Sequence, residues 1–108
     1  MIIIEVVFDA AAGKREEFIG LMRRTMEATR REKGCVLYRF AADIETAGRF
    51  VLTEIWETED ALKAHFRCDA FKAFFEQLAG MGRFVDDTAW QGPLAPYVPP
   101  APGTGART

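Results

Sequence analysis

The chain has 108 residues, of which 49% are hydrophobic and 28% charged, and this length supports a single folded domain with one core. Its formal net charge of −2 argues against a nucleic-acid partner, and one histidine with two cysteines in no metal-type pair argues against a structural zinc site. No run of about 18 apolar residues and no cleavable leader are visible, so we expect no membrane partner and a cytoplasmic location.

The first third of the chain predicts a strand followed by an amphipathic helix. The segment Ile2–Phe8 is rich in β-branched residues, which is typical of a mostly buried strand. After a turn, apolar side chains recur at helical spacing, and Gly34 is placed to end the helix. The apolar stripe consists of Phe18, Leu21, Met22 and Met26. We expect this stripe to face a sheet.

Two further strands are predicted at Cys35–Ala42 and Arg49–Trp56, joined by a connection short enough for an antiparallel hairpin. Alternation along the second strand separates two sets of side chains. One face carries Phe50, Leu52, Glu54 and Trp56, and the other carries Val51, Thr53 and Ile55. Helices from the same chain can cover only one of these largely apolar faces, so the second face needs another cover. On the first strand, Val36, Tyr38 and Phe40 are expected to share a face.

The remaining residues predict two short helices and a last strand. Thr58 can cap a helix that carries His65 at the margin of its apolar side, and Asp69 can cap the next helix. That helix has the strongest helical stripe in the sequence, which we expect to be core: Phe71, Phe74, Phe75 and Leu78. The last strand is predicted at Arg83–Gln91. We place the domain at residues 1–92 and a Pro/Gly-rich arm and tail at 93–108, with disorder expected in the last ten residues.

The order of these elements predicts an α+β fold, namely a ferredoxin-like antiparallel sheet with the helices on one face. The opposite sheet face would keep an apolar set that one chain cannot cover. We therefore predict a homodimer in which two copies pack these faces together.

Several of these residues, taken with their spacing, resemble the antibiotic biosynthesis monooxygenase (ABM) domain. The pattern begins with a glycine turn and a tyrosine strand at 32–38, followed by a Glu-x-Trp strand at 50–57. An alanine-bearing helix at 59–61 comes next, with His65 nine residues after Trp56 and a phenylalanine at position 71. The resemblance implies a ferredoxin-like unit whose sheets pair into a dimeric α+β barrel.

Members of this family include oxygenases that form quinones from anthrones and quinols without metal or flavin, haem-degrading enzymes, and enzymes that act on a small signalling molecule. In the haem-degrading members, a histidine ligates iron four residues after the phenylalanine that matches Phe71, and a tryptophan occupies the position of His65. This chain has Phe75 at the first of these positions. We therefore expect no haem and no other cofactor, with molecular oxygen as co-substrate.

The resemblance places His65 beside a pocket between the helices and the sheet. Its unperturbed pKa lies near neutrality, so it is our candidate catalytic acid/base for a phenol or quinol whose anion passes an electron to oxygen. The alternative is a packed, hydrogen-bonded histidine on the edge of a helix.

Three residues are candidates for substrate binding. Trp56 and Tyr38 could line an aromatic slot for a planar ring, or they could be ordinary core. Glu54 shares the face of Trp56, where a buried carboxylate needs a partner, and Arg39 and Arg49 are the available arginines. The alternative for Glu54 is a structural ion pair or a hydrogen bond to the second copy of the chain.

The sequence therefore favours a homodimeric monooxygenase that acts on a small aromatic or quinol-type metabolite. Two alternatives are a non-catalytic dimeric small-molecule-binding or stress-associated barrel, and an isomerase that uses the same histidine. A cavity reached by His65 and another polar group favours the enzyme, whereas a space filled by Phe, Leu and Met favours the binding or structural role.

Overall fold

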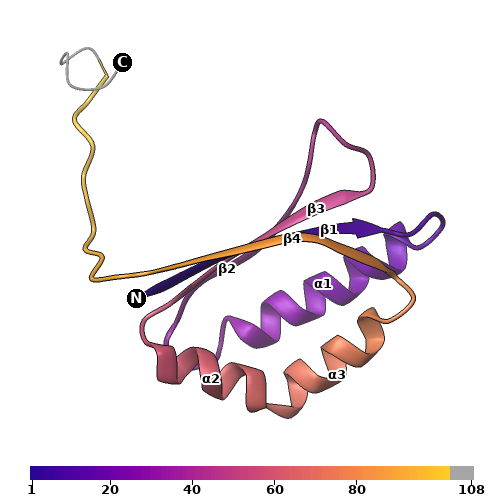
Figure 1. Cartoon of the computed structure of the whole chain (residues 1–108), viewed down its shortest axis with the longest axis horizontal. Helices are drawn as coiled ribbons and strands as arrows, with labels where there is room; N and C mark the ends of the chain where they lie inside the picture. The colour runs from indigo at the N-terminus through magenta and orange to yellow at the C-terminus, as the bar shows by residue number, and fades with distance from the viewer. Residues whose placement is uncertain (103–108) are drawn as a thin grey trace.

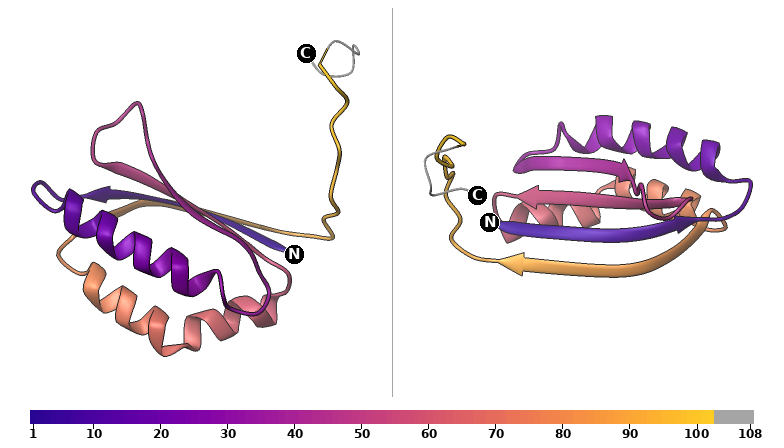
Figure 2. Two further views of the ribbon diagram at one scale, coloured as in Figure 1. Left: turned by 180° about the vertical axis from the view of Figure 1, so that it is seen from behind. Right: turned by 90° about the horizontal axis from the view of Figure 1, so that it is seen from above.

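The computed structural model describes residues 1–102 and contains seven elements in the expected order. The strands are β1 (Ile2–Ala10), β2 (Cys35–Ala42), β3 (Arg49–Trp56) and β4 (Gly82–Gln91), and the helices are α1 (Arg15–Thr29), α2 (Glu59–Arg67) and α3 (Asp69–Leu78). The strands form one antiparallel sheet in the order β2-β3-β1-β4. All three helices lie on one face of this sheet (Figure 1; Figure 2). The predicted ferredoxin-like α+β fold is confirmed.

The core lies between this sheet and the helices, in two adjoining clusters. The first cluster consists of Phe8, Phe18, Leu21, Met22, Phe50 and Leu78, and the second of Tyr38, Leu52 and Trp56. Helix α1 supplies three members of the first cluster at the spacing of an amphipathic helix. The rings of Phe8 and Phe18 are stacked with their centroids 4.8 Å apart, which fixes α1 against β1.

The two faces of β3 differ as the alternation predicts. Phe50, Leu52, Glu54 and Trp56 are all buried under the helices. On the opposite face, the strand register brings side chains together in transverse rows. The first row, called the outer apolar row below, consists of Trp90, Ile3, Ile55 and Leu37. A polar row that includes Glu5, Thr53 and Arg39 follows, and then a row that includes Val7 and Val51. The described helices leave this outer face uncovered (Figure 1).

The prediction for the faces of β2 is wrong at its beginning. Val36 was expected to share a face with Tyr38, but Val36 is 51% exposed and Cys35 packs against the Tyr38 cluster instead. The reason is a register shift, because Cys35 pairs with Trp56 and Leu37 pairs with the preceding residue of β3. The extra residue between them reverses the alternation.

The second and third helices begin at different kinds of cap. The Thr58 side chain accepts a hydrogen bond from the Ala61 N–H (3.1 Å), so the predicted cap of α2 is confirmed. Helix α3 is capped by Cys68, whose Sγ accepts from the Phe71 N–H (3.4 Å), and not by Asp69. Asp69 is instead the first helical residue, where a carboxylate is favourable for the helix dipole.

Residues 93–102 form no helix or strand and leave the body of the fold on the side of the outer face (Figure 1). Tyr97 and Val98 are 78% and 87% exposed, so this segment does not pack against its own sheet. The disorder expected for the last ten residues falls mostly on residues 103–108, which lie outside the described residues. None of the helices within residues 1–102 has the length and apolar character needed to cross a membrane.

Candidate functional site

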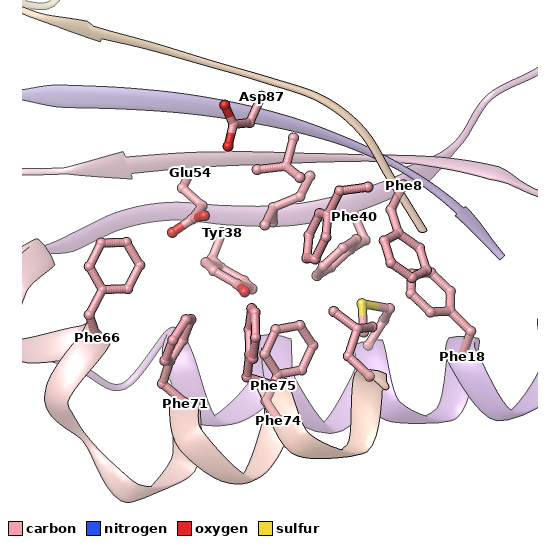
Figure 3. A pocket seen from close by; sticks show the side chains of 15 residues that line it. Phe8, Phe18, Tyr38, Phe40, Glu54, Phe66, Phe71, Phe74, Phe75 and Asp87 are labelled. Carbon is pink, nitrogen blue, oxygen red and sulfur yellow. The ribbon is translucent and has the colours of Figure 1, made fainter. Parts of the chain in front are cut away.

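A cavity of about 340 Å³ lies between the sheet and the three helices (Figure 3). This volume is near the lower end of the range for small-molecule pockets, which begins at about 300 Å³. Its wall is mostly aromatic, with Phe8, Phe18, Tyr38, Phe40, Phe66, Phe71, Phe74, Phe75 and Phe84 supplying the rings. All four residues of the helical stripe line the cavity: Leu78 is buried in the core as expected and Phe74 packs against it, whereas Phe75 is 54% exposed. The space is therefore not closed by the helical stripe.

Glu54 is the buried carboxylate of the cavity wall. The Trp56 Nε1–H donates a hydrogen bond to its Oε1 (3.0 Å), while the side chain as a whole is buried. Every fully buried side-chain oxygen within residues 1–102 has a hydrogen-bond partner. Since the second oxygen of Glu54 has no such partner, it is open to the cavity that the residue lines. Burial raises the pKa of the Glu54 carboxyl, while the Trp56 hydrogen bond and nearby His65 oppose that shift.

Neither of the two arginines considered from the sequence pairs with Glu54. The Arg49 Nε–H donates to Asp9 Oδ1 (2.8 Å) at the far end of β3. Arg39 pairs with Thr53 in the polar row of the outer face, since it lies on the opposite side of β2 from Tyr38. The carboxylate of Glu54 therefore relies on the Trp56 indole and not on an ion pair with either arginine.

Tyr38 lies next to Glu54, because the two residues pair across β2 and β3. Tyr38 is 2% exposed, and its ring lines the cavity. Burial raises the pKa of the Tyr38 phenol, and the negative charges of Glu54 and Glu32 act in the same direction. Tyr38 therefore stays protonated at neutral pH and offers an O–H group rather than a phenolate.

His65 lies behind this cavity wall. Its Nδ1–H donates to the Glu32 carboxylate, with both oxygens at 3.0 Å, and its ring packs on Trp56 and Phe71 at centroid distances of 4.8 and 5.0 Å. His65 is 2% exposed and lines a second cavity of about 150 Å³. Its Nε2 has no partner within residues 1–102, so this nitrogen is open to the second cavity. Phe71 and Phe74 line both cavities and separate them.

The structure therefore brings the four predicted site residues together without giving them equal access to a ligand. Tyr38 and Glu54 line the main cavity, whereas Trp56 is 0% exposed and lies between Glu54 and His65. Trp56 is thus core, which was the alternative weighed for it from the sequence. The role of His65 stays a prediction.

Two further residues of the candidate site were not singled out from the sequence. Glu32 belongs to a charged run that resembles a solvated helix end, and only the fold shows that its carboxylate lies 3.0 Å from His65 Nδ1. Asp87 lines the cavity because the β1–β4 register places it opposite Val6, on the helix-facing side of the sheet. The alternation of β4 could have indicated this position.

Three groups that can bind metal also meet near the small cavity. Ligand atoms of Glu32, His65 and Cys68 lie within 4.8 Å of one another. Both Glu32 oxygens contact His65 Nδ1, and the Cys68 sulfur caps α3. Since each of these groups already has a structural partner, the cluster is explained by hydrogen bonding within the protein.

The raised pKa of Glu54 predicts a pH-dependent effect of Glu54→Gln on stability. The pKa of this carboxyl is near 4.5 in the unfolded chain and higher in the folded protein. The protonated carboxyl therefore stabilises the fold at pH values below the unfolded pKa, and this contribution is lost as the pH rises through the folded pKa. Glutamine cannot ionise, so the Tm of the variant relative to wild type should increase between about pH 4 and about pH 8. Thermal unfolding across this range tests the sign, with Glu45→Gln on an exposed loop as the control. If the Tm of Glu54→Gln minus that of the wild type instead decreased as the pH rises, Glu54 would not be buried without a charged partner.

The fold and the site define a class: single-domain ferredoxin-like α+β proteins with an aromatic cavity between the sheet and the helices. Residues 1–77 match the antibiotic biosynthesis monooxygenase family. The chain belongs to this family, and the resemblance inferred from the sequence is confirmed.

Individual relatives agree with this family. The chain is 38% identical over 64 residues to "Uncharacterized protein sll1783" of Synechocystis, a match that covers 59% of this chain and 44% of that protein. The chain thus spans less than half the length of that relative. It is 28% identical over 74 residues to "Putative monooxygenase YcnE" of Bacillus subtilis, which covers 68% of this chain and 78% of that protein.

The fold also has close structural neighbours. A "putative antibiotic biosynthesis monooxygenase" from Deinococcus radiodurans superposes with a TM-score of 0.81 at 25% sequence identity, covering 91% of this chain and 98% of that one. A conserved protein from Methanosarcina mazei superposes with a TM-score of 0.78, also at 25% identity, covering 83% and 90%. The names of the Bacillus and Deinococcus proteins describe them as putative monooxygenases.

Proposed function

We propose that this protein is a homodimeric monooxygenase that oxidises a small aromatic or quinol-type metabolite without a cofactor. The observation that carries the proposal is the aromatic cavity, whose wall holds a buried carboxylate and a protonated phenol side by side. The rings can hold a planar substrate, while Tyr38 and Glu54 offer one hydrogen-bond donor and one acceptor to its oxygens.

Two groups can serve as the acid/base of this reaction. Glu54 faces the cavity directly, and its raised pKa brings the carboxyl closer to neutrality, where a general base is most effective. His65, the residue predicted from the sequence, opens to the second cavity, and Phe71 stands between it and the main one. We propose Glu54 as the group that touches the substrate and keep His65 as the alternative acid/base.

The proposed reaction needs only the substrate and oxygen. The base takes a proton from an activated phenol, and the resulting anion passes one electron to O2. The two radicals combine at a ring-activated carbon to form a peroxide. The protonated base returns its proton to the peroxide, and the remaining C–H bond then breaks together with the O–O bond. The C–H proton joins the departing hydroxide to give water, so that a CH2 group and O2 yield a carbonyl and water. General acid/base catalysis of this kind typically contributes about 10²–10⁴-fold.

The proposed dimer uses the outer face of the sheet. This face presents the outer apolar row and the valines beyond it, and helices of the same chain cover only the opposite face (Figure 1). A two-fold axis through this face would place the same row of each copy against the other. The exposed segment 93–98 leaves the body on the same side, within reach of a second copy (Figure 1).

Oxygen consumption tests the proposed function. We expect uptake with a panel of anthrones, quinols and catechols, reduced at least tenfold in Glu54→Gln. His65→Asn, measured in parallel, decides between the two acid/base candidates, and Glu45→Gln serves as the surface control.

Uptake lost in His65→Asn but kept in Glu54→Gln would assign the role to His65. Substrate turnover without oxygen uptake would favour the isomerase. Binding of the same compounds without any turnover would favour a small-molecule-binding barrel and overturn the proposed reaction.

A further inference from the structure

In the part of the chain that the structure describes, the cavity wall contains acidic side chains and no basic side chain, although His65 lies behind the wall close to Glu54. Of the described residues that line it, two are carboxylates, Glu54 and Asp87, and none is a lysine, arginine or histidine. The other polar group of the wall, Tyr38, stays protonated because burial raises its pKa. The wall therefore attracts cations and repels anions.

Glu54 provides the anchor for such a charge. Within residues 1–102, no basic side chain forms an ion pair with it, and its free oxygen faces the cavity. A buried carboxylate without a charged partner is costly, so a positively charged group beside it would restore the lost electrostatic stabilisation. Its other oxygen is held by the Trp56 indole, which fixes the direction of the carboxylate.

Aromatic rings surround the position next to this oxygen. Figure 3 shows the Glu54 carboxylate pointing from the sheet into the space between Phe66 and Tyr38, with Phe71 below it. The rings of Phe66 and Phe71 are 5.1 Å apart and meet edge to face. Faces of aromatic rings attract ammonium groups, and the attraction is stronger where water is excluded. A carboxylate combined with such rings suits an organic cation better than it suits a metal ion.

Asp87 adds a second negative charge at a distance. It is exposed on the edge strand β4, opposite Val6 of β1. Glu54 lies two strands away on β3, opposite Ile4, and is therefore offset by two residues along the strands. Strand spacing and rise place the two Cα atoms about 12 Å apart. The two acids are thus too far apart to share one proton as a catalytic pair. Asp87 marks the end of the cavity at the edge strand β4, and Glu54 marks its buried end.

We propose that the ligand of this cavity is an aromatic molecule that carries a protonated amine, with the ammonium group held by Glu54 and the ring system between the phenylalanines. Aromatic carboxylates of the same shape are rejected. This inference shares the cavity of the proposed function and concerns binding, so it does not require turnover. With Glu54 paired to the ammonium group, the acid/base role in any turnover falls to His65, the alternative named above.

A matched series of three probes tests the proposal by calorimetry: 1-naphthylmethylamine, 1-naphthylmethanol and 1-naphthoate. We expect the wild-type protein to bind the amine at least tenfold more tightly than the alcohol, and the carboxylate to bind weakest. Glu54→Gln should remove the preference for the amine and leave the affinity for the alcohol nearly unchanged. Glu45→Gln is the control, since it makes the same substitution at an exposed position in the connection between β2 and β3.

Equal affinities for the amine and the alcohol in the wild type would overturn the proposal, as would tighter binding of the carboxylate or binding of none of the three. The wild-type series alone decides this, even if Glu54→Gln does not fold. Preference for the amine without oxygen uptake from any compound would support this inference and refute the monooxygenase. Oxygen uptake from neutral quinols without any preference for amines would support the monooxygenase and refute this inference.

Discussion

Replacement of Ile55 by aspartate is expected to convert the proposed dimer into monomers. Ile55 lies in the middle of the outer apolar row, between Ile3 and Leu37. A two-fold contact through this row would bury the new carboxylate twice, with no basic residue in the row to pair with it. Burying an unpaired charge costs several kcal/mol for each ion, which weakens dimerisation by a factor of more than 10³. Sedimentation equilibrium over a range of protein concentrations measures this change.

The matched control is Ile44→Asp. Ile44 is 100% exposed in the connection between β2 and β3, so the same substitution there should leave assembly unchanged. Circular dichroism of Ile55→Asp separates dissociation from unfolding, because the substituted side chain points away from the core. A dimer that survives Ile55→Asp with wild-type affinity would show that the outer face is not the interface.

The fold was predictable because its strongest signals are local. The alternation of Arg49–Trp56, with apolar residues on both faces, requires a central strand that is covered on both sides. The structure has this strand in the interior of the sheet, and its helix-facing residues are buried. The register shift in β2 was not predictable, because a single inserted residue leaves no clear trace in hydrophobic periodicity.

The site was predictable only in part. Tyr38 and Glu54 were found because they belong to strands whose faces could be assigned from the sequence. The Glu32–His65 hydrogen bond joins residues 33 positions apart through a loop and a helix end, and no pattern in the sequence fixes such a distance. The open cavity depends on whether the phenylalanines of α3 fill or line the space, which is a matter of packing and not of periodicity.

The glycine of the family pattern has a physical explanation in the fold. Gly34 has a φ of +84°, a conformation that favours glycine, and its carbonyl accepts a hydrogen bond from the Glu57 N–H (2.8 Å) at the end of β3. A Cβ on Gly34 would lie 2.5 Å from the Cβ of Ala61 in α2. Gly34 and Ala61 of the family pattern therefore contact each other, and this contact sets how closely α2 approaches the start of β2. This contact holds the helix that carries His65 in position.

Gly34→Ala is therefore expected to destabilise the protein by roughly 2–5 kcal/mol. A left-handed backbone costs an alanine about 1–2 kcal/mol, and the overlap with Ala61 adds about 1–3 kcal/mol of overpacking. Urea unfolding at one fixed protein concentration measures the loss, since a dimer's stability depends on concentration. Gly80→Ala is the matched control, because Gly80 has a nearly identical φ of +80° and a Cβ there would meet nothing within 4 Å.

The difference between these two variants isolates the contact with α2 from the backbone conformation. Ala61→Gly removes the opposing methyl group, and alone it should cost about 1 kcal/mol of helix propensity. In the double variant Gly34→Ala/Ala61→Gly, the overlap disappears. The double variant should therefore lose less stability than the sum of the losses in the two single variants. Equal losses in Gly34→Ala and Gly80→Ala, or strictly additive losses in the double variant, would show that Gly34 is needed only for its backbone angle. Subadditive losses would show that the spacing of the family pattern is set by the approach of α2 to the sheet.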